Sequence, residues 1–313
     1  LSQTQTDFDH NNVFVSYAYY LGHGKTWAAN NSEAQMYIDG STISYNGNLW
    51  KNETTSYYWP KDGGSLTFFA YSYNKKDMTV GDNSGFACVW AVGEDGQYQG
   101  GINGHFDVAT NKNVDFLVAD IAADKTENKN SYAHTGVPTL FRHKLSMVNV
   151  AANLAEDYAN KKFILNSVKF TNLYHYATYS QIPEKMTPGG NDFLSDQVYA
   201  ENVGFEVKSG GLIAVPAEIK GGAKVEDGQY IYIPQEFNDN SYIVITYTVE
   251  TVVGNNVVKE ECTKTVKVKD VFPKWEMGHR YTFNLTFSLN EIHWDPAVEN
   301  WIDDEAGNIT IDR

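Results

Sequence analysis

Apolar and polar residues alternate strictly near the end of the chain, and this pattern constrains the fold more than any other. Between positions 281 and 290 every odd residue is apolar and every even residue is polar. A period of two places the apolar side chains on one face of a half-buried β-strand. Apolar residues hold no helical period over a long window, and we expect at most a short helix at 151–161. The sequence therefore predicts an all-β fold.

Short segments rich in β-branched and aromatic residues recur along the rest of the chain, with glycine, proline and asparagine between them. Such a series of short strands and turns is typical of β-sandwiches. The predicted strands are 13–20, 35–39 and 42–45 as a hairpin with a two-residue turn at 40–41, 66–73, 86–92, 114–121, 139–150, 162–173, 212–216, 230–235, 241–250, 257–269 and 281–289. The predicted loops are 93–104, 124–131 and 180–202.

The strand at 66–73 follows a distinctive turn. Pro60 has no backbone donor, so regular structure should end before it. The two glycines in 61–65 supply the dihedral angles of a tight reversal. Aromatic and small residues then occupy both faces of the strand, which indicates a position inside a sandwich.

A chain of 313 residues is long enough for about two domains. Gly136-Val137-Pro138 interrupts the series of predicted strands, directly before the long strand predicted at 139–150. We therefore predict domains at 1–136 and 137–313. Cys88 and Cys262 then fall in different domains, so a disulfide between them is the less favoured interpretation.

The charge of the chain excludes some classes of partner. The formal net charge is −15 and the pI is near 4.9, which opposes binding to nucleic acid and to anionic lipid surfaces. Tyrosine is abundant, with 21 residues, and favours strands and half-buried surfaces. This composition fits an extracellular β-protein.

Several motifs approach known sites without matching them. Residues 22–26 end like a phosphate loop but lack the earlier glycine. The acidic segments 124–130 and 303–308 lack the central glycine and closing glutamate of a calcium loop. His143 lies on an apolar face of its predicted strand, which favours a hydrogen-bonded core histidine. The sequence predicts no catalytic residues, no cofactor and no metal site, and hence no enzyme.

Several sequence blocks follow one another in order over nearly the whole chain. They are 58–60 with 66–71, 114–119, 140–146, 232–235, 243–249, 275–283 and 292–301. Together they resemble the fimbrillin-like family of the Bacteroidales. The resemblance implies two transthyretin-like, Greek-key β-sandwich domains in tandem. It also implies a structural or adhesive subunit of cell-surface fimbriae, exported to the outer membrane as a lipoprotein.

The resemblance further implies polymerisation by strand exchange with other fimbrial subunits. In that scheme an N-terminal strand is lost after proteolysis, and the C-terminal segment of a neighbour fills the groove. Asn308, Ile309, Thr310 and Ile311 are the predicted donor strand, because apolar residues alternate there; a frayed or self-paired end is the alternative. Host or bacterial surface ligands are further partners, and the membrane is reached only through a lipid anchor on the precursor.

Two parts of the family pattern are not found in these residues: a leader with a lipid-attachment cysteine and an activating arginine near the start. A role as stalk, anchor or tip subunit therefore stays open. The rival interpretation is a secreted carbohydrate-binding or adhesion module that acts as a monomer, with exposed tyrosine and tryptophan rings stacking on sugars.

Overall fold

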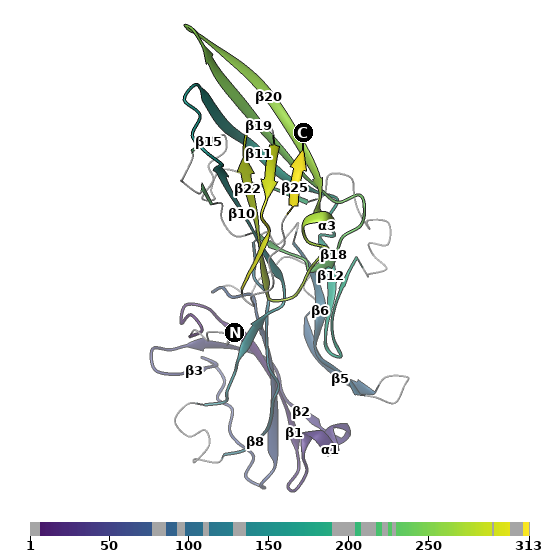
Figure 1. Ribbon diagram of the computed structural model, residues 1–313. Helices are drawn as coiled ribbons and strands as arrows, with labels where there is room; N and C mark the ends of the chain where they lie inside the picture. Colours follow the sequence, from purple (N-terminus) through teal and green to yellow (C-terminus); the bar gives the residue numbers. More distant parts are fainter. Residues whose placement is uncertain are drawn as a thin grey trace. The chain divides into compact units, whose positions relative to one another are not determined.

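The structure of the chain is a computed structural model (Figure 1). It describes residues 7–76, 86–92, 98–108, 113–127, 136–189, 204–207, 217–220, 225–226, 230–289, 291–300 and 309–312. Strands dominate these residues, and the helices among them are short: α1 (Trp27–Asn30), the 3-10 helix η1 (Asn31–Glu33) and α3 (Val268–Val271). The predicted all-β, sandwich-like fold is confirmed, while its transthyretin-like detail stays a prediction.

The chain divides into two compact units. The N-terminal unit contains residues 4–144 together with 177–187, and the C-terminal unit contains 145–176 and 188–313 along with 1–3. The domain ranges 1–136 and 137–313 stay a prediction. The contacts between residues divide the chain after Lys144. They also assign the hairpin 177–187, which comes later in the sequence, to the N-terminal unit.

The described strands of the N-terminal unit form two sheets. The first has the order β3-β2-β1-β4-β7-β9, with β8 also paired to β4, and the second has the order β13-β12-β6-β5. The strands of the first sheet are β1 (Phe14–Leu21), β2 (Gln35–Tyr45), β3 (Trp50–Lys51), β4 (Ser65–Ser72), β7 (Leu117–Ala119), β8 (Ala122–Lys125) and β9 (Phe141–His143). Those of the second are β5 (Ala87–Val92), β6 (Tyr98–Asp107), β12 (Tyr176–Ile182) and β13 (Glu184–Pro188).

Aromatic rings fill the space between these two sheets. The rings of Phe86 and Phe116 stack with centroids 4.3 Å apart, and Tyr71 of β4 lies 5.6 Å from Phe86. Phe106 of β6 packs against Phe116 at 6.0 Å. The predicted strand 66–73 is therefore a core strand, as the aromatic residues on both its faces indicate.

In the described part of the C-terminal unit the strands also form two main sheets. The first has the order β16-β10-β22-β23-β25, with β17 on β10 and β24 on β22, and the second has the order β14-β11-β19-β20, with β15 on β11. The first contains β10 (Ser146–Leu154), β16 (Val225–Glu226), β17 (Tyr230–Tyr232), β22 (His279–Phe287), β23 (Glu291–Trp294), β24 (Ala297–Asn300) and β25 (Ile309–Asp312). The others are β11 (Lys161–Thr171), β14 (Gly204–Val207), β15 (Ala217–Ile219), β19 (Tyr242–Val253), β20 (Asn256–Lys267) and the small pair β18 (Gln235–Glu236) and β21 (Lys274–Trp275).

The strictly alternating segment becomes β22, as predicted. Its odd residues from 279 to 287 are buried, and its backbone pairs in parallel with β10. The Phe283 ring lies 5.1 Å from the Phe170 ring of β11. The alternation therefore supplies one half of the core between the two sheets. The parallel partner of β22 was not predicted, because parallel strands join across long connections that leave no local signal.

Replacing Phe283 by alanine should destabilise the C-terminal unit by about 3–5 kcal/mol, because a fully buried ring would leave a cavity. Leu289, just beyond the same strand, is exposed, so Leu289→Ala is the matched control and should change stability by less than about 0.5 kcal/mol. Urea unfolding followed by tryptophan fluorescence measures both. Equal effects of the two substitutions would contradict this account of the core.

Four predicted segments differ from the structure. The hairpin predicted at 35–45 is a single strand, β2, which stays paired with β1 across a register shift between Ser41 and Ile38. The loop predicted at 93–104 is a strand from Tyr98 onward, because its backbone pairs antiparallel with β5 despite its glycines. The single strand predicted at 139–150 is interrupted at Lys144 and Leu145, and β10 then continues to Leu154 in place of a short helix. Within the loop predicted at 180–202, residues 180–188 belong to strands β12 and β13 and their turn. The edge strand predicted at 212–216 lies outside the described residues.

Candidate functional site

Strand β1 lies in the interior of its sheet. Its backbone pairs antiparallel with β2 from Phe14 to Tyr20 and with β4 from Val15 to Leu21. Both of its hydrogen-bonding edges are therefore occupied. Removing β1 would leave two facing rows of unpaired amides and carbonyls, one on β2 and one on β4.

Side chains on both faces of β1 are also buried. Tyr19 packs against Phe69 and Trp27, with ring centroids 5.8 and 6.0 Å away, and burial raises the pKa of its hydroxyl. Phe14 belongs to a separate cluster, in which Phe8 and Phe141 pack against it at 6.0 and 5.3 Å. A gap left by β1 would therefore be apolar on both faces as well as open along both backbone edges.

An exposed turn follows β1 directly. Residues 22–26 join β1 to the four-residue helix α1, and Gly24 has the positive φ of 76° that this turn requires. Lys25 is the first lysine or arginine of the sequence, and the next is Lys51. Its side chain is 41% exposed and forms an ion pair with Glu33. The sequence pattern that approached a phosphate loop is thus a solvent-exposed turn between β1 and a very short helix.

The predicted donor residues lie at the end of the C-terminal unit. Asn308 lies outside the described residues, whereas Ile309, Thr310 and Ile311 begin β25. β25 pairs antiparallel with β23, and Ile311 lies opposite Ile292. Among the described residues β23 is its sole strand partner, so β25 is an edge strand that can leave without dividing the sheet.

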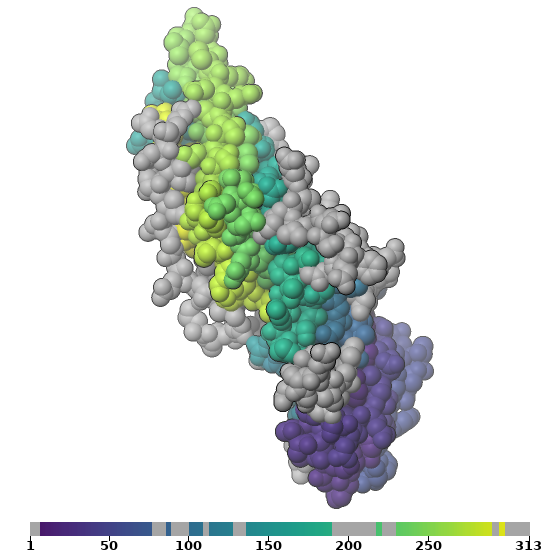
Figure 2. All heavy atoms as spheres, turned by 90° about the vertical axis from the view of Figure 1, so that its right-hand side faces the viewer, coloured from purple at the N-terminus to yellow at the C-terminus, as the bar shows by residue number. Residues whose placement is uncertain are grey.

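Another edge strand, β20, carries charges along its exposed length. Glu260, Glu261 and Lys264 lie on it, and Lys259 forms an ion pair of 2.7 Å with Glu250 of β19. Charged side chains on a free edge discourage uncontrolled pairing with other chains. The end of the β19–β20 hairpin projects from the C-terminal unit (Figures 1 and 2).

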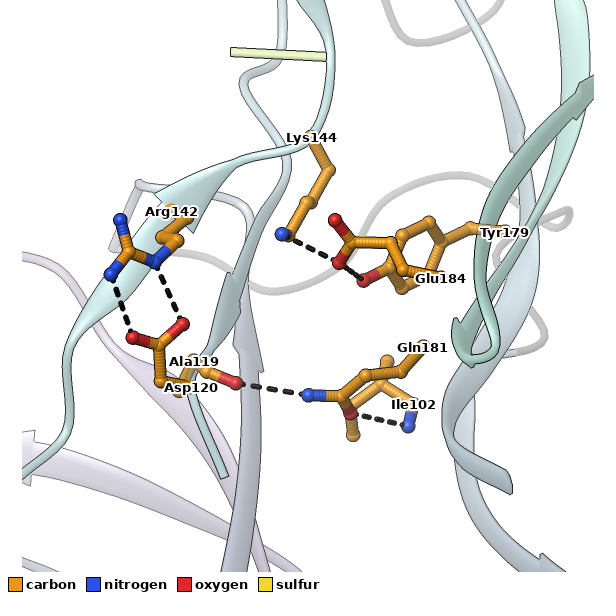
Figure 3. Close-up of polar contacts among 8 residues, drawn as sticks. All are labelled: Ile102, Ala119, Asp120, Arg142, Lys144, Tyr179, Gln181 and Glu184. Carbon is orange, nitrogen blue, oxygen red and sulfur yellow. Dashed lines mark hydrogen bonds and ion pairs between the residues drawn. The ribbon is translucent and has the colours of Figure 1, made fainter. Parts of the chain in front are cut away.

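A polar cluster holds the returning hairpin 177–187 in the N-terminal unit (Figure 3). The ammonium of Lys144 lies 2.8 Å from Glu184, which also accepts a hydrogen bond of 2.9 Å from the Tyr179 hydroxyl. Burial, followed by the nearby Glu184 carboxylate, raises the pKa of Tyr179, so the hydroxyl stays a donor. Arg142 forms a bidentate pair with Asp120 at 2.7 and 2.8 Å.

Gln181 joins the two sheets of this unit directly. Its side-chain amide donates to the Ala119 carbonyl of β7 at 3.0 Å, and its carbonyl accepts from the Ile102 amide of β6 at 2.9 Å (Figure 3). A Cβ on Gly101 would lie 2.6 Å from the Gln181 oxygen, so glycine is needed at that position. Sequence reasoning missed this cluster, because its members come from segments far apart in the chain.

Replacing Gln181 by alanine should destabilise the N-terminal unit by about 1–3 kcal/mol, because two backbone groups between the sheets lose their partner. Amide hydrogen exchange at Ile102 should accelerate at the same time. Lys185 lies exposed in the same hairpin, so Lys185→Ala is the matched control. If exchange at Ile102 is unchanged in Gln181→Ala, the contact does not hold the sheets together.

Reactive side chains are not brought together in the residues described. Cys88 and Cys262 are buried free thiols in different units, and burial raises the pKa of Cys88 to about 12. His143 lies 2.8 Å from Asp115 but is 34% exposed, so it is hydrogen-bonded and not the core residue that we predicted. Within the described ranges no three His, Cys, Asp or Glu side chains gather as a metal site requires. None of the described helices has the length and apolar character needed to span a bilayer.

The fold and the site define a class of protein. It is an all-β protein of two sandwich-like units, and its candidate functional features are the edges of strands and not a cluster of reactive side chains in the described residues. The family model described as fimbrillin-like matches residues 4–301. The chain belongs to the fimbrillin-like family, as its sequence blocks indicate. Membership supports a fimbrial or adhesive role, a structural and not an enzymatic one, in a cell-surface appendage.

Several solved structures are similar to this chain. A candidate cell adhesion protein from Bacteroides uniformis has 14% identity and a TM-score of 0.50, over 92% of this chain and 91% of that chain. The tip fimbrial protein Mfa3 from Porphyromonas gingivalis has 8% identity and a TM-score of 0.39, over 94% and 95%. The fimbrial anchor protein Mfa2 from the same organism has 9% identity and a TM-score of 0.28, over 95% and 92%. The first of these three structures supports the fold of this chain and nothing beyond the fold. A comparison with curated proteins gives no match.

Proposed function

We propose that this chain is a structural subunit of cell-surface fimbriae, and that subunits join when the C-terminal strand of one replaces β1 of the next. The observation that supports this proposal best is the position of β1. It is the first strand described, it lies between β2 and β4, and one cut in the following exposed turn would separate it from the rest of the chain.

Exchange at this position is physically favourable. The gap left by β1 presents two open backbone edges and apolar surface on both faces, and a donated strand satisfies both. Burying about ten residues in such a groove contributes on the order of 10 kcal/mol from apolar area before the cost of ordering the donor. The resulting contact would dissociate very slowly.

The proposed donor is the C-terminal segment that includes Ile309 and Ile311. These apolar residues alternate with Thr310 and Asp312, as a strand that fills a groove requires. In the isolated chain β25 occupies an edge beside β23, so its release exposes one edge of a sheet and does not split it. The partners on this account are other fimbrial subunits, and the surface location follows from an exported, lipid-anchored precursor.

Limited digestion with trypsin tests the proposal. Trypsin cuts after lysine and arginine, and cleavage after Lys25 would release β1 from the covalent chain. We expect the digested protein to form rods in electron micrographs and ladders that persist in detergent on gels. Protein that is cut at Lys25 and still migrates as a monomer at high concentration would refute strand exchange at β1.

A further inference from the structure

Three tyrosines from separate segments gather on the N-terminal unit. Tyr20 lies near the end of β1, Tyr37 lies in β2, and Tyr58 lies between β3 and β4. The ring centroids of Tyr20 and Tyr37 are 6.4 Å apart, with planes inclined by 32°. The Tyr37 hydroxyl donates a hydrogen bond of 2.6 Å to the Tyr58 carbonyl. We call this group, together with Asp62, the tyrosine platform.

Tyr20 and Asp62 are held in place before any ligand arrives. The Tyr20 hydroxyl donates to the Asp62 carboxylate, whose other oxygen accepts from the Gly64 amide at 3.0 Å. A Cβ on Gly64 would collide with the Tyr20 ring, so glycine allows the ring to lie against the backbone. Groups fixed by such contacts lose little conformational entropy on binding.

Two of the tyrosine rings are open to solvent. The exposed fraction is 74% for Tyr58 and 39% for Tyr37. Tyrosine combines a flat apolar face with a polar rim, so a ligand for this surface should share both characters.

The negative charge of Asp62 restricts the class of ligand that the platform can bind. The hydrogen bond from Tyr20, and then that from Gly64, holds the pKa of Asp62 below its usual range, so the group is a carboxylate at neutral pH. An ionised carboxylate only accepts hydrogen bonds, and each oxygen has capacity beyond its present partner. The neighbouring Lys61 is engaged with Glu127. The site therefore favours hydroxyl donors and repels anions, in a chain whose formal charge is already −15.

We propose that the tyrosine platform binds a neutral glycan, whose C–H faces stack on Tyr58 and Tyr37 while a hydroxyl donates to Asp62. Sugars combine apolar faces with hydroxyl donors, which is the chemistry that the platform complements. A protein partner fits less well, because a stable protein interface needs about 20–30 residues on each side. This binding site goes beyond the proposed assembly function. Because Tyr20 lies on β1, the complete platform exists only before β1 is replaced, so the site belongs to the uncleaved chain.

The test uses the full, uncleaved chain. The protein is applied to an array of neutral, sialylated and sulfated oligosaccharides, and the strongest neutral oligosaccharide is then titrated by calorimetry. Tyr58→Ala should weaken binding about five- to tenfold, and Tyr58→Phe, which keeps the ring, should retain it. Val253→Ala removes an exposed apolar side chain from the other unit and should leave binding unchanged.

Three results would overturn the proposal. These are an array without a neutral ligand, a preference for sialylated or sulfated oligosaccharides, and equal losses in Tyr58→Ala and Val253→Ala. If Tyr58→Ala alters rod formation but no glycan binds, the platform is a contact between subunits. Because the uncleaved chain is used, failure of strand exchange would not affect the outcome.

Discussion

Replacing Lys25 by glutamine should prevent trypsin from triggering assembly. The substitution removes the first tryptic site in the sequence, which lies between β1 and β2. The chain from β1 to β2 (Gln35–Tyr45) would therefore stay intact. A strand that is paired on both edges and still tethered cannot be replaced at a useful rate. We expect wild-type protein to convert to detergent-resistant oligomers and Lys25→Gln protein to remain monomeric, as measured by gel electrophoresis and electron microscopy.

Lys51→Gln is the matched control. Lys51 is also exposed, but it follows β2, so a cut there leaves β1 attached to its neighbour. Trypsin should therefore assemble the Lys51→Gln protein as efficiently as wild type. Lys25 and Lys51 are both solvent-exposed, and water screens the ion pair of Lys25 with Glu33, so neither variant should unfold. Equal assembly of Lys25→Gln and wild-type protein would rule out the turn after β1 as the activating site.

Deleting residues 303–313 should abolish assembly while the monomer remains folded. The deletion removes the proposed donor, yet from the described part of the C-terminal unit it takes only the edge strand β25. The core strand β22 keeps its pairing with β10 and β23. We expect the thermal unfolding midpoint to change little, and we expect no rods after digestion that cuts at Lys25.

A full-length variant separates loss of apolar side chains from loss of chain length. Ile309→Asp combined with Ile311→Asp should also block assembly, because a charged side chain is strongly disfavoured in an apolar groove. Thr310→Ser combined with Asp312→Asn changes the alternating polar positions and should assemble normally. Rods formed by the 303–313 deletion would remove the tail from the mechanism, even if cleavage at Lys25 remains necessary.

Local sequence patterns predict where the strands lie, but they do not predict which strands pair with one another. The alternation at 281–290 and the aromatic segment at 66–73 place β22 and β4 in the two cores, because side-chain period and composition are local properties. The parallel pairing of β22 with β10 depends on residues more than a hundred positions away, and no local pattern encodes it. The position of β1 between β2 and β4 was beyond sequence reasoning for the same reason.

The polar cluster around hairpin 177–187 could not be predicted from the sequence for the same reason, because its residues lie far apart in the chain. The glycine-rich segment around Gly101 predicts a loop, although the missing side chain of Gly101 admits Gln181 between two strands. Lys144 lies in a segment that was predicted as one continuous strand, and its ion pair with Glu184 bridges forty positions of sequence. Neither a glycine-rich segment nor an extended β-segment signals such a contact, because the fold alone brings these residues together.

The most direct test of strand exchange measures the peptide that assembly releases. A site for a sequence-specific protease is placed in the turn 22–26, the cut protein is allowed to assemble, and rods are separated from solution by centrifugation. Mass spectrometry with an isotope-labelled standard then quantifies the β1 peptide in both fractions. Strand exchange predicts one peptide in solution for each assembled subunit, and retention of the peptide by the 303–313 deletion. Rods that keep β1 in equimolar amount would contradict the account.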